Sequence, residues 1–164
     1  MLTIAKKTMA VGGHINVRTE KHGDEDVIAC DIGITFMDQR ELADTLLGDG
    51  AVDAFWRKTE HGLTEPRFPR MGAIALAEKI ESCRVEIWPR GLDEASIVFG
   101  DANLSRVRLT PQPGGVVKIT TTLQCKPEGD DYTTLVDCLN REVEIAIECE
   151  GFGAQQSLPL DAAA

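Results

Sequence analysis

An alternation of apolar and polar residues on both sides of a proline- and glycine-rich turn constrains the fold of this chain most. The feature spans residues 96–124, with the turn at 111–115. Its apolar phase consists of Val107, Leu109, Val117, Ile119, Thr121 and Leu123. Period-two patterning predicts an antiparallel strand pair with one buried and one solvated face. The chain therefore has to build a sheet around this pair.

Further alternating segments occur on both sides of that pair. We expect strands at 2–11, 14–20, 26–36, 71–76, 82–88, 96–99 and 143–149, with Gly12–Gly13 between the first two. In 26–36, one face carries Ile28, Cys30, Ile32, Ile34 and Phe36. These segments predict an α+β fold dominated by antiparallel β, a β-sandwich or barrel of roughly eight strands with two or three short helices.

Helical signals are short and local. Asp38 gives a capping-box-like start to a helix with Leu42, Leu46 and Leu47, and Gly48 can end it. A second short helix is expected at Val52, Phe55 and Trp56, and a third through 132–139, started by Asp130 or Asp131. Residues 57–70 contain glycine and proline breaks and predict a long irregular loop.

Composition limits the class of protein. With 164 residues, of which 43% are hydrophobic and 27% charged, we expect one β-rich domain over 1–152 and a flexible tail over 153–164. No apolar run approaches the roughly 20 residues that cross a bilayer, and the N-terminus lacks the order of a secretory signal. We therefore expect no membrane association and a cytoplasmic location.

Chemistry-bearing residues are scattered. The five cysteines are Cys30, Cys83, Cys125, Cys138 and Cys149; their odd number and the lack of a C-x-x-C pair predict buried, reduced thiols. The histidines stand apart from them, so we expect no metal site and no cofactor.

No nucleophile or phosphate-loop motif is present, so the chain is not predicted to be an enzyme. Asp31 is interpreted as a structural or outward-facing carboxylate rather than a catalytic one.

Two candidate binding surfaces remain in a chain whose net charge is −10. Arg106, Arg108 and Lys118 form a stripe that could follow a phosphate backbone or protect a sheet edge. The loop interleaves cations with aromatic residues, as single-strand binding surfaces do, through Trp56, Arg57, Lys58, Arg67, Phe68 and Arg70. In the favoured alternative, the two aromatic residues are core anchors and the cations only solvate the loop.

The acidic run 24–26 is interpreted as a hairpin tip rather than a metal loop.

Several segments resemble a group of small proteins of tailed bacteriophages that carry no known chemical role. They are Asn16–Asp24 with Val27–Ile32, Pro66–Pro69, a Gly100–Ala102 hairpin followed by Gly114–Val117, and Leu139–Ile145. The resemblance covers most of 14–149. It implies a phage or prophage origin, a place in the host cytoplasm, and an early-region gene near recombination functions.

These observations lead to two functional hypotheses. The first is a non-enzymatic phage accessory module of DNA recombination, replication or counter-defence, which binds single-stranded DNA or a phage or host protein. The alternative is a virion structural subunit, a tail-tube-like β-sandwich that assembles edge to edge. The oligomeric state is left open by the sequence.

Overall fold

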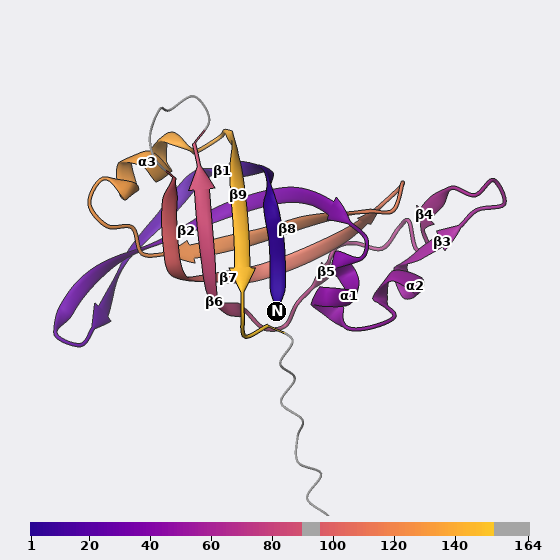
Figure 1. Ribbon diagram of the computed structural model, residues 1–164, viewed down its shortest axis with the longest axis horizontal. Coiled ribbons are helices and arrows are strands. Elements are labelled where there is room, and N and C mark those ends of the chain that lie inside the picture. The colour runs from indigo at the N-terminus through magenta and orange to yellow at the C-terminus, as the bar shows by residue number, and fades with distance from the viewer. Residues whose placement is uncertain (90–95, 153–164) are drawn as a thin grey trace, which may run out of the picture.

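Strands dominate the computed structural model, which describes residues 1–89 and 96–152 (Figure 1). In those ranges the elements are β1 (Leu2–His22), β2 (Glu25–Gln39), α1 (Leu42–Leu47), α2 (Ala51–Phe55), β3 (Trp56–Lys58), β4 (Thr64–Pro66), β5 (Ile74–Ala75), β6 (Ile80–Trp88), β7 (Ile97–Gln112), β8 (Val116–Cys125), α3 (Asp131–Asp137) and β9 (Glu142–Cys149). All strand pairs are antiparallel. The predicted α+β class is confirmed.

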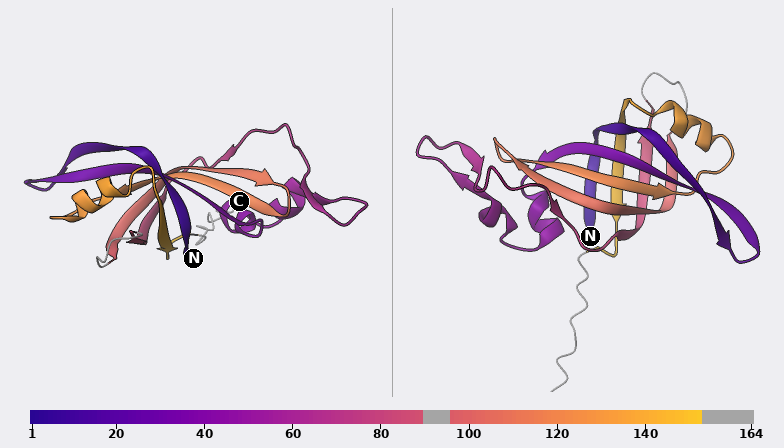
Figure 2. Two further views of the ribbon diagram at one scale, coloured as in Figure 1. Left: turned by 90° about the horizontal axis from the view of Figure 1, so that it is seen from above. Right: turned by 180° about the vertical axis from the view of Figure 1, so that it is seen from behind.

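The large sheet closes on itself. Its strand order is β5-β7-β6-β9-β1-β2-β8, and β8 also pairs with β7. The pairing therefore runs in a ring through β7, β6, β9, β1, β2 and β8, and forms a flattened barrel of two crossing layers (Figure 2). This agrees with the predicted sandwich or barrel. The short β3–β4 hairpin forms a separate two-stranded sheet.

β1 belongs to both layers because it bends in its middle. Residues 2–10 pair with β9, residues 10–22 pair with β2, and the register shifts between Val11 and Ile15. The prediction of two separate strands around Gly12–Gly13 is wrong, since these glycines lie inside one continuous strand. A Cβ at Gly12 would stand 3.3 Å from the carbonyl oxygen of Gly33, so the bend brings two backbones together where a side chain fits poorly.

β7 turns the opposite corner by means of a bulge. Its first half pairs with β6 and its second half with β8, and the register shifts between Ser105 and Arg108. Arg106 adopts a left-handed backbone with φ of 54°. The buried phase changes there, from Ala102 and Leu104 to Val107 and Leu109. The predicted hairpin at 100–102 is wrong, because the strand continues through it.

The predicted apolar phase fills the barrel. Val117 and Leu123 are 0% exposed and Ile119 is 2% exposed. Residues from every long strand join them in one continuous core.

Because β6 and β9 place Cys83 directly opposite Cys149, with 4.2 Å between their Cα atoms, these two form a disulfide. The prediction of five free thiols is therefore wrong for this pair, whereas Cys30, Cys125 and Cys138 are free and buried as expected.

The helices lie near the predicted positions with shifted starts. α1 ends at Gly48 as predicted, but Asp38 still belongs to β2 and pairs with Lys7 instead of capping the helix. α2 ends before Trp56, which begins β3. α3 follows Asp130, which makes no side-chain capping bond.

Two further predictions concern the segments 57–70 and 153–164. The predicted loop 57–70 contains the β3–β4 hairpin, so it is partly regular. The predicted tail 153–164 lies outside the described residues. Among the helices of the described ranges, none has the length and apolar character needed to cross a membrane.

Candidate binding surfaces

The predicted basic stripe lies on the outer face of β7 and β8. Arg106, Arg108 and Lys118 are exposed. Arg108 stands opposite Thr120, and Lys118 stands opposite Thr110, so these two cations are diagonal neighbours. Both lie inside the sheet, since β5 flanks Arg108 and β2 flanks Lys118 on their other sides. Edge protection therefore does not explain these two side chains.

Trp56 is a core anchor. It is 3% exposed, and its indole Nε1 donates a hydrogen bond of 3.1 Å to the carbonyl oxygen of Gln112. Arg67 also has a structural part, because its guanidinium donates to the backbone oxygens of Asp53 and Trp56. Phe68, by contrast, is 52% exposed. The stacking surface predicted for this segment therefore loses its tryptophan and keeps one exposed ring.

The segment from α1 to β5, here called the insertion, is attached to the tip of the β7–β8 hairpin. The amide of Gly114 donates to the carbonyl oxygen of Thr64 at 2.8 Å, and Trp56 bonds to the end of β7. The insertion projects at one end of the long axis (Figure 1). Both predicted surfaces thus belong to this half of the molecule. Their exposed cations on the insertion are Arg57, Lys58, Arg67 and Arg70.

A second projection, here called the ribbon, extends at the opposite end (Figures 1 and 2). It consists of residues 16–29 of β1 and β2, which pair only with each other in the described sheet. Val17 and Ile28 are 44% and 51% exposed, on the same face as Cys30. The ribbon therefore carries the apolar face of the core out into solvent. Its tip, at residues 23–26, is exposed and acidic, as predicted for a hairpin turn.

The other face of the ribbon base holds Asp31 in a hydrogen-bond network. Its carboxylate accepts from Arg18, from Gln124 at 3.2 Å and from Asn16 at 3.5 Å. Partial burial raises the pKa of Asp31, but these hydrogen bonds outweigh burial and hold the pKa below its usual value. The same contact with Asp31 is the main reason that the pKa of Arg18 is raised. The structural role predicted for Asp31 agrees with this geometry.

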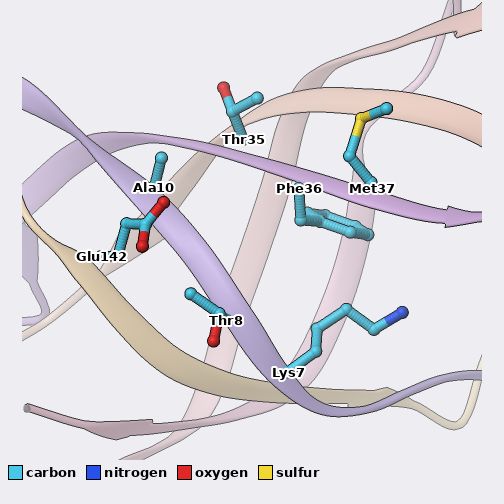
Figure 3. Close-up of a pocket in the computed structure, with 7 residues that line it drawn as sticks. All are labelled: Lys7, Thr8, Ala10, Thr35, Phe36, Met37 and Glu142. Atoms are coloured by element: carbon cyan, nitrogen blue, oxygen red, sulfur yellow. The ribbon is translucent and has the colours of Figure 1, made fainter.

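Two hollows are open on the surface. The larger, about 460 Å³, lies where β1 parts from β2 beside β9 and is lined by Lys7, Thr8, Ala10, Thr35, Phe36, Met37 and Glu142 (Figure 3). The amine of Lys7 is paired with Asp38, and Glu142 is the carboxylate that lines the hollow. The smaller, about 260 Å³, adjoins the Asp31 network and mixes Arg18, Lys79 and Lys126 with Glu20 and Asp101. Cys125 also lines the smaller hollow, where its thiol is free and buried.

The free thiols Cys30, Cys125 and Cys138 are buried, which disfavours the reactive thiolate form. Burial is the main reason that the pKa of Cys125 is raised to about 12, and it also raises the pKa values of Cys30 and Cys138. Over residues 1–89 and 96–152, no group of three His, Cys, Asp or Glu residues lies close enough to hold a metal ion.

No family model, curated protein or solved structure matches the chain. The resemblance to tailed-phage proteins stays a prediction from the sequence segments alone. The two projections and the basic stripe are therefore the features from which a function can be inferred.

Proposed function

We propose that the chain is a non-enzymatic phage accessory module that works in the host cytoplasm by binding a protein, in DNA recombination, replication or counter-defence. The observation that supports this proposal is the position of the large exposed apolar side chains. Many of them stand on the ribbon and the insertion, away from either hollow: Val17, Ile28, Leu63, Phe68 and Met71. Exposed apolar side chains rimmed by charges are typical of protein-binding surfaces.

Single-stranded DNA is the less favoured ligand. Sequence-tolerant binding of single strands combines cations with several stacking aromatics. Here Trp56 is buried and Arg67 is hydrogen-bonded to backbone, which leaves Phe68 as the exposed ring among the predicted residues. The overall charge of −10 also opposes a polyanion. The stripe of Arg106, Arg108 and Lys118 alone would have to supply the binding energy.

Two measurements test this proposal together. Fluorescence anisotropy with a labelled single-stranded oligonucleotide at low ionic strength should show no binding in the micromolar range. Tagged protein recovered from phage-carrying cells after nuclease treatment should retain a protein partner, and a bait altered on one projection should lose it. Oligonucleotide binding that falls steeply with salt and disappears in R106E/R108E would overturn the proposal in favour of nucleic acid.

A further inference from the structure

The two projections differ in charge as well as in position. The ribbon tip carries Asp24, Glu25 and Asp26, all exposed. The insertion carries Lys58 and Arg70 next to its exposed apolar residues. None of these five charged side chains forms an ion pair with a residue of the described ranges. The ribbon, residues 16–29, has a net charge of −2, whereas residues 57–71 of the insertion have a net charge of +2 although they include Glu60 and Glu65.

We propose that the ribbon of one copy docks on the insertion of a second copy, so that the chain associates head to tail. This inference rests on the proposed protein-binding function and names its partner. Val17 and Ile28 of the ribbon would pack against Leu63, Phe68 and Met71 of the insertion, with the acidic tip beside Lys58 and Arg70. Such a heterologous contact uses two different surfaces of each subunit and produces rings or filaments.

Charge complementarity selects this arrangement over a symmetric dimer. Two ribbons placed together would bring two acidic tips into contact, and two insertions would bring cations together. Like charges facing each other across an interface are unfavourable. Contact between the ribbon and residues 57–71 of the insertion joins surfaces of opposite net charge.

Contact with a partner should stabilise the ribbon. An isolated two-stranded hairpin is marginally stable in water, and strand additions or packing usually support it. Residues 16–29 have no backbone pairing with other described strands, and Ile28 remains 51% exposed on the core-facing side. Docking would cover this face and order the ribbon at the same time.

The test uses two full-length variants with opposite changes. D24K/E25K makes the ribbon tip basic, and K58E/R70E makes the insertion acidic. Asp26 and Arg57 are left in place because their Cα partners across the hairpins are Lys21 and Glu65, so each keeps an opposite charge facing it. The matched control R108E/K118E changes net charge by the same amount as K58E/R70E, on the outer sheet face.

Light scattering with size-exclusion chromatography, from micromolar to millimolar concentration at low salt, measures the outcome. Wild type and the control should associate, each of the two test variants alone should associate at least about tenfold more weakly, and an equimolar mixture of the two should recover association. The mixture recovers because each reversed end then meets a complementary one. Circular dichroism and melting temperature verify that the variants fold.

Three outcomes would overturn this inference. They are a wild type that stays monomeric throughout, association that neither double variant weakens, and a mixture that fails to recover although both variants fold. A monomer that still captures another protein through its projections would leave the proposed function standing and assign the ends to that other partner. Loss of both self-association and capture would remove the proposed function as well.

Discussion

β8 and the ribbon carry the same kind of alternation, yet one is core and the other is surface. In β8 the apolar phase is almost completely buried, with Leu123 at 0% exposure. In the ribbon the apolar phase reaches Ile28, which is 51% exposed. Neighbouring strands flank β8 on both sides, whereas the ribbon strands have only each other. Alternation therefore identifies the face of a strand, and the neighbouring strands decide whether that face is buried.

The largest expected difference concerns one substitution in each region. Leu123→Ala should lower the free energy of unfolding by about 2–5 kcal/mol because it leaves a cavity in the core. Ile28→Ala should cost about 0.5 kcal/mol or less in dilute protein, since half of the side chain already contacts water. Chemical denaturation of both variants measures the contrast. Equal losses would show that the ribbon is packed as tightly as β8.

A second contrast separates the two cross-strand cysteine pairs. Cys83 and Cys149 face each other across β6 and β9, and Cys30 and Cys125 face each other across β2 and β8. In protein purified without reductant, denaturation and alkylation should modify three thiols, and reduction first should modify five. Breaking the disulfide should destabilise the fold by about 2–4 kcal/mol. Five modified thiols without reduction would contradict the disulfide.

The Asp31 network should make the ribbon base sensitive to acid. A carboxylate whose pKa is lowered by folding stabilises the protein above its unfolded pKa, and that contribution disappears as the pH falls through the folded value. We expect Asp31→Asn to cost about 1–2 kcal/mol at neutral pH, because charge-assisted hydrogen bonds to Arg18 are lost at a partly exposed site. The loss should shrink below about pH 4. Denaturation curves across that range measure it, and a loss independent of pH would contradict the assigned cause.

Much of the fold could be predicted because the signals were local. The turn at 111–115, the buried phase of β8 and the end of α1 at Gly48 each follow from residues close in sequence. β1 was predicted as two strands because a glycine pair can mark a strand end as well as a bend, and only the pairing with β9 and β2 shows that the strand continues. The local sign of the bulge was that the apolar residues shift from even to odd positions around Arg106.

The candidate site was harder to predict because it depends on which strands have neighbours. Exposure of Val17 and Ile28 could not be deduced from a pattern that also describes core strands. Strands much longer than the usual five or six residues overhang their sheet. Of the two strands that meet at residue 23, the sequence indicated such a length only for 26–36, because β1 was predicted as two shorter strands. The disulfide required knowing that β6 lies beside β9, whose cysteines are 66 residues apart.

Hydrogen–deuterium exchange at low and high protein concentration tests the central comparison most directly. Amides of 117–123 should be strongly protected at both concentrations, because they belong to the closed sheet. Amides of 16–29 should exchange much faster in dilute protein and gain protection as concentration rises, in parallel with those of 58–71 on the insertion. Ribbon amides protected as strongly as β8 in dilute protein would contradict the distinction between scaffold and projection. Ribbon exchange that is fast and unchanged by concentration would contradict the docking of one copy on another.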